Sequence, residues 1–346
     1  MRALIKHSRG EGNVSIGEAS EPNCGKGKVK IEVRFCGVCG TDLHVFHDTF
    51  PNYPPVILGH EFSGVVVEVG PGVSKVASGD GVTVFPASAV ICGKCPYCRS
   101  GNFLFCPTRR GMGHGVDGAF TRFAVVREDQ VYKLPEAFSF EEAALSEPFA
   151  AATHAVCEVT RPQAGDVVLL SGPGPIGLMC LKLLAAMGIY TIVAGLGMDA
   201  ARLECAHRIG AARIVNVEKD DLIEAVQQET AGAGADIAIE AAGSPSSLRN
   251  CLEAVRPMGR ITQAGIYGRD VEIPLDRLFH KQLQLHGSVG YTPATWDRVM
   301  DIFAQEKVRL RDLVSDVLPL SEWEQAFDTC ASKRGLKVLM TPQDHA

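Results

Sequence analysis

The sequence has no long hydrophobic run and no concentration of positive charge. No apolar stretch approaches the length that crosses a bilayer, and residues 1–12 contain no apolar core of signal-peptide length. The net charge is −6, and no lysine- or arginine-rich segment is interleaved with aromatic residues. A nucleic-acid binder needs a basic surface to displace counterions from phosphate. We therefore expect a cytoplasmic protein with neither a nucleic acid nor a membrane as partner.

Internal repeats and low-complexity segments are also absent from the sequence. The 346 residues are too many for one ordinary core, and 46% of them are hydrophobic. This combination predicts two well-packed domains.

The two parts of the chain differ in hydrophobic pattern. Residues 1–150 contain short alternating segments between glycine turns, which predict a β-rich barrel or sandwich. Residues 167–287 alternate short apolar strands with helices, which predicts a parallel sheet with helices on both faces. The expected fold class is therefore α/β, with a β-rich domain plus a doubly wound parallel-sheet domain. The strands expected in the first part are 29–35, 62–69, 82–85, 118–126 and 131–134.

Four of the twelve cysteines stand close together in the segment CGKCPYCRSGNFLFC, at Cys92, Cys95, Cys98 and Cys106. Thiols two residues apart suit a common ion better than disulfides, and four thiolates fill all the positions of a tetrahedral Zn²⁺. We therefore expect a closed, structural zinc site in a lobe at residues 90–108. The alternative is four reduced cysteines in a loop.

A glycine-rich turn, GPGPIG, follows the apolar segment VVLL and precedes an apolar helix. In a G-x-G-x-x-G turn the first glycine makes the tight turn, the second admits a pyrophosphate, and the third lets helix and strand pack closely. The alternative is a glycine turn without a ligand. The candidate dinucleotide-binding residues of this turn are Gly172, Gly174, Pro175, Ile176 and Gly177.

The next strand ends at Gly195-Leu196-Gly197, without the acidic residue that usually binds the ribose hydroxyls of NAD. Small residues such as Gly197 leave space for a 2′-phosphate, and Arg202 is a candidate to pair with it. Arg202 can equally be a solvated charge, and Asp199 can cap the helix that follows. We expect NAD(P) as the cofactor and favour NADP or dual use.

A second candidate metal set combines Cys39 with His60, Glu61 and Glu147. A cysteine, a histidine and a carboxylate can hold zinc and leave one position open for water or substrate. The C-x2-C of Cys36 and Cys39 also fits half of a zinc ribbon or a redox pair, but no second half with matching spacing is free. Glu147 can alternatively be an acid at a helix N-terminus, stabilised by the helix dipole.

Together these segments resemble the zinc-containing medium-chain alcohol and polyol dehydrogenases. The resemblance covers nearly the whole chain in order, through CGVCGTDLH (36–44), GHEFSGVVVEVG (59–70), the cysteine lobe, SEPFAAATHA (146–155) and GPGPIG (172–177). It implies a GroES-like catalytic domain, residues 1–152 and 288–346, interrupted by a Rossmann domain, residues 153–287. The Glu147-Pro148 pair resembles the sorbitol dehydrogenase branch; threonine dehydrogenases tend to have Asp-Pro there.

The resemblance implies two zinc ions per chain. Cys39, His60 and Glu61 are its catalytic zinc ligands, with Glu147 binding the metal or holding its water. It also implies reversible oxidation of a polyol or secondary alcohol to a ketone, with hydride passing to NAD(P). By the same resemblance, Thr41 takes the proton, the cofactor ribose passes it on, and His44 hands it to solvent. Relatives of this kind are tetramers or dimers, so a homo-oligomer acting on a small-molecule substrate is expected.

Other functions share some of these features. L-Threonine 3-dehydrogenase-like oxidation is the alternative within the family. A non-catalytic nucleotide-binding sensor or scaffold, or a zinc-free quinone reductase on the same fold, would keep the nucleotide domain. The complete ligand set argues against both of these last two.

Overall fold

The computed structural model describes residues 1–342. The chain divides into two compact units: Met1–Glu147 with Tyr291–Ala346, and Pro148–Gly290. The chain thus leaves the first unit once and returns to it. The domain boundaries expected from the sequence lie between residues 152 and 153 and between residues 287 and 288. We call the discontinuous unit the first unit and the continuous one the second unit.

The first unit is built on a sheet with the strand order β15-β16-β3-β5-β6-β8, in which β7 also pairs with β3. Strand β3, in the middle of this sheet, is rich in β-branched residues, and its Val29, Ile31 and Val33 are fully buried. The strands of this sheet are β3 (Lys28–Gly37), β5 (Glu61–Val69), β6 (Gly81–Val84), β7 (Phe123–Arg127), β8 (Val131–Lys133), β15 (Val314–Pro319) and β16 (Lys337–Thr341). A small second sheet has the order β2-β1-β4, from β1 (Arg2–Lys6), β2 (Val14–Glu18) and β4 (Val56–Ile57).

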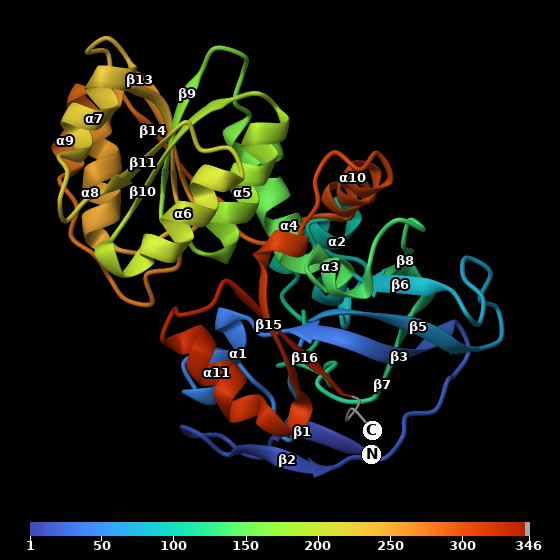
Figure 1. The fold of residues 1–346 in the computed structure, drawn as a ribbon. Helices are drawn as coiled ribbons and strands as arrows, with labels where there is room; N and C mark the ends of the chain where they lie inside the picture. The colour runs from blue at the N-terminus through green and yellow to red at the C-terminus, as the bar shows by residue number, and fades with distance from the viewer. Residues whose placement is uncertain (343–346) are drawn as a thin grey trace. The chain divides into compact units, whose positions relative to one another are not determined.

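The returning C-terminal segment completes this unit. Strand β16 pairs antiparallel with β3, and Val338, Met340 and Phe327 share one hydrophobic core with the residues of β3. Figure 1 shows β15 and β16, in red, beside the blue β3. The helices of the first unit are α1 (Gly40–Phe46), α2 (Pro96–Arg99), α3 (Phe140–Ala144), α10 (Pro293–Ala304) and α11 (Trp323–Ala331).

The second unit is a parallel six-stranded sheet with the order β11-β10-β9-β12-β13-β14. Helices α5 and α6 cover one face, and α7 and α8 cover the other (Figure 1). The strands are β9 (Val167–Ser171), β10 (Tyr190–Gly195), β11 (Arg213–Asn216), β12 (Ala235–Glu240), β13 (Val255–Gln263) and β14 (Gln284–Gly287). The helices are α5 (Pro175–Ala186), α6 (Ala200–Arg208), α7 (Leu222–Glu229), α8 (Pro245–Ala254) and α9 (Leu275–His280), and α4 (Ser146–Thr153) continues into the π-helical His154–Thr160 at the start of the unit.

One expected strand, 118–126, is wrong in its first half, because β7 begins only at Phe123. The preceding segment bonds to another loop instead: Gly118 N donates to Ile57 O at 2.8 Å, and Phe120 N donates to Leu58 O at 2.9 Å. A Cβ on Gly118 would lie 2.1 Å from Gly59 O. The glycine therefore serves a close approach of two backbones, which the alternating pattern does not reveal.

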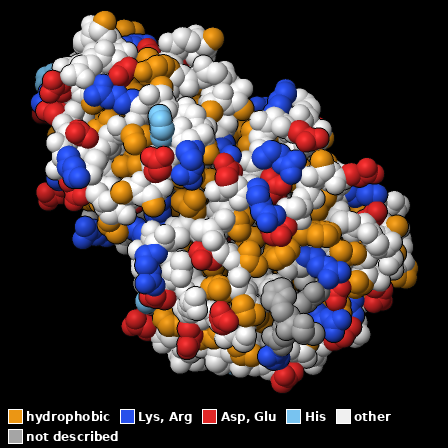
Figure 2. Space-filling model, viewed as in Figure 1, with side chains coloured by type: hydrophobic (Ala, Val, Ile, Leu, Met, Phe, Trp, Pro, Cys, Tyr) orange, Lys and Arg blue, Asp and Glu red, His pale blue; other side chains and the backbone are white. Residues whose placement is uncertain are grey.

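Within residues 1–342, no helix combines the length and the apolar character needed to cross a membrane. Figure 2 shows acidic and basic side chains interspersed over the visible face of each unit. This distribution agrees with the modest net charge of −6 and forms no extended basic surface on that face.

Candidate metal and nucleotide sites

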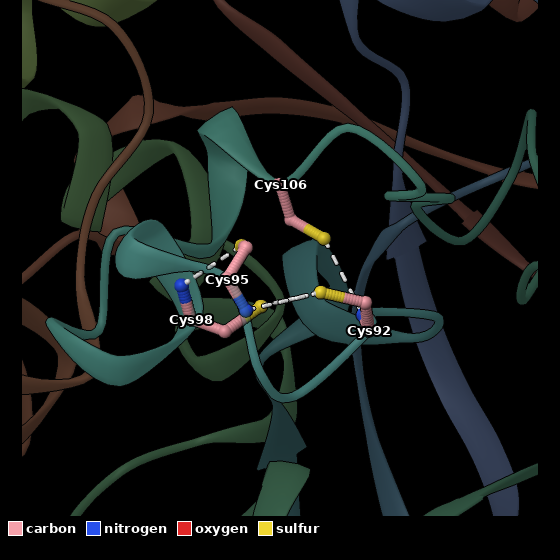
Figure 3. Close-up of side chains that lie close together, drawn as sticks. All are labelled: Cys92, Cys95, Cys98 and Cys106. Atoms are coloured by element: carbon pink, nitrogen blue, oxygen red, sulfur yellow. Dashed lines mark hydrogen bonds between the residues drawn. The ribbon is translucent and has the colours of Figure 1, made fainter.

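The cysteine lobe brings its four thiols around one point. Cys92, Cys95, Cys98 and Cys106 all have Sγ atoms within 4.8 Å of one another (Figure 3). The Cys92 and Cys98 sulfurs are 3.9 Å apart, close to the roughly 3.8 Å expected between thiolates 2.3 Å from a tetrahedral Zn²⁺ and far beyond a disulfide bond. Backbone amides of Cys92, Cys95 and Cys98 donate to neighbouring sulfurs at 3.3, 3.3 and 3.4 Å. The donor set fits a closed zinc site.

The thiols of this lobe differ in acidity. The Thr108 hydroxyl, with help from the Cys92 amide, lowers the pKa of Cys106 to about 6, so that this thiol ionises near neutral pH. Burial raises the pKa of Cys98 to about 12. A cation at the centre of the four sulfurs is what would allow all of them to be thiolates together.

The second metal set is assembled from two elements. Cys39 is the N-cap of α1, and its Sγ accepts from Thr41 N at 3.5 Å. His60 and Glu61 lie where the chain enters β5. One ligand atom from each of these three residues lies within 4.8 Å of the other two. A thiolate, an imidazole and a carboxylate form a three-ligand set of the kind that leaves zinc an open position.

Buried polar atoms support a cation at this point. His60 Nδ1 and Glu61 Oε1 are inaccessible and have no hydrogen-bond partner among the residues described, and Glu61 Oε2 has an ion pair with Lys337. Such atoms are expensive to bury unless something binds them. Burial disfavours a charged His60, yet Asp42 outweighs it and holds the pKa of His60 well above its usual value. Surroundings that favour a proton on a buried imidazole also favour a metal cation, so the residues fit zinc.

Two side chains surround the ligands. Asp42 Oδ2 accepts from Cys39 N at 2.9 Å, and its Oδ1 lies 3.7 Å from His60 Nδ1, so one carboxylate orients two ligands. Lys337 Nζ lies 2.5 Å from Glu61 Oε2 in an ion pair that is almost completely buried. Glu61 and Cys39 raise the pKa of Lys337 above its usual value in spite of its burial. The ammonium is therefore charged at neutral pH.

Glu147 is not part of the three-residue cluster. Its Oε1 accepts a hydrogen bond from the Tyr291 hydroxyl at 2.8 Å. Burial raises the pKa of Glu147, and the charge of His60 opposes this rise. Glu147 thus interacts electrostatically with His60 and Glu61. The Tyr291 hydroxyl fixes the position of its carboxylate.

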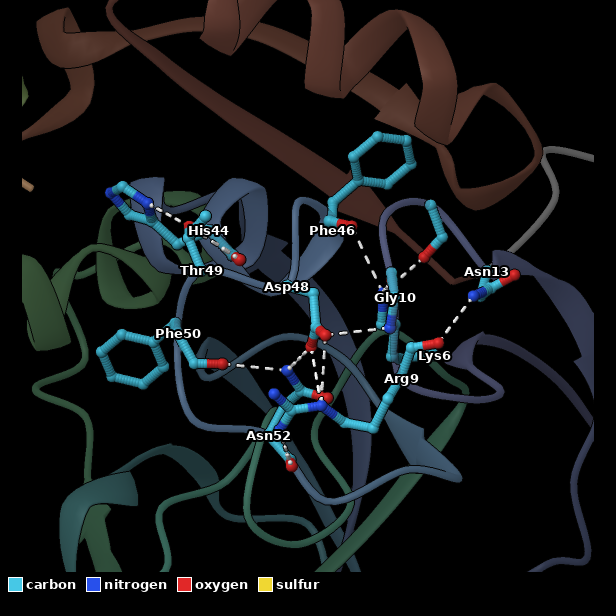
Figure 4. Close-up of polar contacts among 11 residues, drawn as sticks. Lys6, Arg9, Gly10, Asn13, His44, Phe46, Asp48, Thr49, Phe50 and Asn52 are labelled. Carbon is cyan, nitrogen blue, oxygen red and sulfur yellow. Dashed lines mark hydrogen bonds and ion pairs between the residues drawn. The ribbon is translucent and has the colours of Figure 1, made fainter.

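The proton-relay candidates lie on α1. Thr41 follows Cys39 in the first turn, and His44 is exposed in the last turn. His44 Nδ1 lies 3.0 Å from Thr49 Oγ1, and this hydroxyl donates back to His44 O at 3.2 Å. Figure 4 shows His44 and Thr49 side by side.

A buried lysine fixes the end of α1. Lys6 Nζ, fully buried, donates to the carbonyls of Gly10, Gly12 (2.5 Å) and Phe46 (3.3 Å). Phe46 is the last residue of the helix, so the ammonium satisfies a carbonyl that the helix leaves open. Asp48 then accepts from Gly10 N at 2.9 Å (Figure 4). The helix that carries Cys39, Thr41 and His44 is held at both ends.

The glycines of the nucleotide turn play the three expected parts. Gly172 has φ +106°, and a Cβ there would lie 2.6 Å from Ala242 N. A Cβ on Gly177 would lie 2.0 Å from Gly172 O, so this glycine permits close packing of helix on strand. A Cβ on Gly174 would meet nothing within 4 Å, and Gly174 is the N-cap of α5, with Pro175 and Ile176 as the first helical residues. The open side is the one on which a pyrophosphate binds.

An acidic residue reaches the end of β10 from another strand. Glu218, after β11, accepts from Gly197 N through Oε2 at 2.6 Å. Arg202 is buried and lies 3.7 Å from Asp199 Oδ1. Sequence inspection of β10 alone misses Glu218, because the acid follows the neighbouring strand of the sheet. A Cβ on Gly195 would lie 2.9 Å from Pro173 Cγ, so the strand end itself has no room for a side chain.

Two further polar residues lie near the metal cluster. The Arg109 side chain is half-buried, and its Nε donates to Ala87 O at 2.9 Å. His114 is 8% exposed and packs edge-on against Phe50. Burial lowers the pKa of His114 to about 4, helped by the charges of His60 and Arg109. No local motif in the sequence marks either residue.

Comparison with known proteins agrees with this geometry. The family model for the alcohol dehydrogenase GroES-like domain matches residues 25–136, and the model for zinc-binding dehydrogenase matches residues 175–305. A sorbitol dehydrogenase from Halalkalibacterium halodurans is 35% identical over 99% of this chain and 100% of its own. An L-threonine 3-dehydrogenase from Pyrococcus horikoshii is 34% identical over 98% of each chain. A zinc-binding dehydrogenase from Sinorhizobium meliloti 1021, solved with NADP, matches at a TM-score of 0.90 and 29% identity over 99% of both chains.

The chain belongs to the zinc-dependent medium-chain dehydrogenases, with a GroES-like domain and a Rossmann domain, as expected. Within this family it is a zinc-dependent polyol or alcohol dehydrogenase that uses NAD(P). The threonine dehydrogenase alternative is related but no better supported. The expected catalytic and structural zinc ions fit the two ligand clusters.

Proposed function

We propose that Cys39, His60 and Glu61 bind the catalytic zinc. The observation that carries this proposal is the cluster of three ligand atoms within 4.8 Å, two of whose residues have buried polar atoms without hydrogen bonds. The structural zinc is assigned to Cys92, Cys95, Cys98 and Cys106, whose sulfurs meet the same distance criterion.

The reaction is the reversible oxidation of a polyol or secondary alcohol. Zinc supplies the Lewis acidity that lowers the pKa of a hydroxyl group, and the nicotinamide supplies the hydride acceptor. The Thr41 hydroxyl accepts the proton, and His44 passes it to solvent, a role that suits an exposed imidazole. Glu147, oriented by Tyr291, holds a water or a substrate hydroxyl beside the metal. Glu147 is not a member of the three-residue ligand cluster, which favours this role over direct ligation.

The cofactor site is assigned to the turn after β9. Gly172, Gly174, Pro175, Ile176 and Gly177 bind the pyrophosphate, supported by the open space at Gly174. Gly197 and Arg202 lie where the adenosine ribose is expected, at the end of β10. The glycines there leave room for a 2′-phosphate, whereas the Glu218 carboxylate at Gly197 N disfavours its negative charge, so we propose dual use of NAD and NADP.

We further propose that residues 1–152 and 288–346 act as the catalytic domain and residues 153–287 as the nucleotide domain. The family resemblance supports a homo-oligomer, either a tetramer or a dimer. All twelve cysteines are free thiols, which fits a cytoplasmic enzyme because that compartment keeps thiols reduced.

The test combines metal analysis with an activity screen. We expect two zinc ions per chain, and one in a Cys39→Ala, His60→Ala double variant. Cofactor reduction is followed with sorbitol, xylitol, galactitol, 2,3-butanediol, inositols and threonine, each with NAD and NADP. Wild-type turnover on a polyol that disappears in the double variant supports the assignment. Turnover that survives removal of this zinc contradicts it.

A further inference from the structure

The side chains of two neighbouring arginines, Arg109 and Arg110, point in different directions. Arg110 is exposed, and its guanidinium lies over the Tyr53 ring at 4.2 Å from the centroid. Arg109 turns inward, and its Nε donates to Ala87 O at 2.9 Å. This bond fixes the side chain but uses only one of its five N–H groups. The planar end of the guanidinium remains available.

The end of Arg109 meets His114 at a glycine. A Cβ on Gly111 would lie 2.8 Å from Arg109 Nη2 and 2.7 Å from His114 Nε2. The two nitrogens are therefore within 5.5 Å of each other, the sum of these distances. His114 Nδ1 is buried without a hydrogen-bond partner. Any side chain at position 111 would push against this polar pair.

The pair lies beside the proposed catalytic zinc site. A Cβ on Gly113, the residue before His114, would lie 2.9 Å from Gly59 O, and Gly59 directly precedes the proposed ligand His60. Burial lowers the pKa of Arg109, and the charges of Tyr291 and Glu147 oppose this change. A positive charge is thus held next to the residues that surround the reacting hydroxyl, in the same unit of the chain.

Arg109 has no carboxylate partner. Within residues 1–342 its guanidinium forms no ion pair, and the hydrogen bond to Ala87 O is the only one that the side chain makes. Two buried lysines of this unit are better satisfied: Lys337 pairs with Glu61, and Lys6 donates to three backbone carbonyls. A partly desolvated guanidinium that has no carboxylate in contact and leaves most of its N–H groups unused is stabilised by a ligand that supplies negative charge there.

We infer that Arg109 and His114 form an anion subsite beside the zinc site, and that the substrate is an alcohol or polyol carrying a phosphate monoester or a carboxylate. This inference rests on the proposed alcohol oxidation and narrows its substrate class. A guanidinium binds either oxyanion through paired N–H groups. The neutral His114 ring adds a hydrogen bond.

The experiment compares three substrates with one carbon skeleton: sorbitol, sorbitol 6-phosphate and gluconate. We expect kcat/KM for one anionic member to exceed that for sorbitol by at least about tenfold, mainly through KM, because charge-assisted hydrogen bonds are strong. Whether sorbitol 6-phosphate or gluconate gains identifies the anion. Arg109→Gln should bring the ratio close to one, and Arg109→Lys should retain part of it. Arg110→Gln is the matched control and keeps the wild-type ratio.

Equal or better use of sorbitol by the wild type, or an anion preference that persists in Arg109→Gln, overturns the inference. A second measurement is independent of turnover: calorimetric binding of sorbitol 6-phosphate and gluconate to the zinc-loaded protein. Binding that Arg109→Lys weakens supports the subsite even if no alcohol is oxidised, in which case the proposed function fails alone. Absence of binding by the wild type to either anion overturns the subsite whatever the activity.

Discussion

Lys337 Nζ lies 2.5 Å from Glu61 Oε2, with both side chains almost completely buried. Lys337 also donates to Val38 O at 2.9 Å, which fixes the ammonium between β16 and the segment before α1. The carboxylate of a proposed zinc ligand therefore has a protein cation beside it. Glu61 has two candidate counter-charges, the ammonium and the metal, and their contributions can be separated.

Lys337→Met should destabilise the zinc-free protein more than the zinc-loaded protein. Removing one partner of a buried ion pair typically costs about 3–5 kcal/mol, and zinc bound to Glu61 would replace part of the lost positive charge. Urea unfolding with and without chelator measures the difference. Lys307→Met, at an exposed position, is the control and should change neither value. Equal destabilisation of both forms would show that Glu61 does not bind the metal.

His44→Gln should lower kcat by about tenfold and alter its pH profile, because the last step of proton release loses its acid–base group. Added imidazole should restore part of the rate. His47→Gln is a close control, since His47 is an exposed histidine three residues later that contacts Glu11 instead. Full turnover in His44→Gln, with an unchanged pH profile, would remove His44 from the relay.

Glu218→Gln should shift cofactor preference toward NADP. The Glu218 carboxylate, held at Gly197 N, places a negative charge where a 2′-phosphate would add more. Neutralising it should raise the ratio of kcat/KM for NADP to that for NAD by about tenfold, the effect of roughly 1.4 kcal/mol. Glu204→Gln, exposed on α6, should leave the ratio unaltered. A ratio that stays constant or falls in Glu218→Gln would refute this role.

Glu142→Gln should destabilise the first unit at neutral pH by about 2–4 kcal/mol. The Glu142 carboxylate is buried, binds Arg309 at 2.6 Å and accepts from Leu310 N at 2.8 Å. Burial raises its pKa, but Arg309 and these amides outweigh burial and lower it below the usual value.

The pH dependence of this effect has a definite sign. A lowered folded-state pKa stabilises the protein above the unfolded pKa of about 4.3, and that stability is lost as pH falls through the lower folded value. The difference between wild type and Glu142→Gln in denaturant unfolding should therefore be constant from pH 7 to about 5 and shrink below that. A difference that does not shrink in acid would mean that the charge of Glu142 contributes little.

Local patterns predicted most of the fold. The alternation in residues 167–287 predicted the strand–helix pattern of the second unit, and the apolar segments before and after GPGPIG correspond to β9 and α5, because strand–turn–helix units form from adjacent residues. The sequence patterns missed α8 and the terminal strands β1 and β16. Strand β16 is short and is stabilised by pairing with β3 from the far end of the chain. A single-sequence pattern does not contain that contact.

The candidate sites divide in the same way. The cysteine lobe and the nucleotide turn consist of closely spaced residues, so their chemistry is visible in the sequence. Lys337 reaches Glu61 from another strand of the same sheet, and Glu218, which follows β11, reaches Gly197 at the end of the neighbouring β10. Arg109 is of interest because its guanidinium has no carboxylate in contact. Contacts of this kind depend on distances in the folded protein, so the spacing of residues along the sequence does not predict them.

The interrupted layout of the first unit constrains the order in which the protein can mature. As the ribosome releases the chain, residues 148–290 form a continuous unit and can fold as soon as they emerge. The metal-binding unit must wait for β16, since this strand supplies the ammonium of Lys337 to Glu61 and pairs with the edge of β3. Until β16 is in place, the Glu61 carboxylate lacks the counter-charge of Lys337. A chain released only as far as residue 336 therefore has a metal-binding unit whose sheet is still open at this edge of β3.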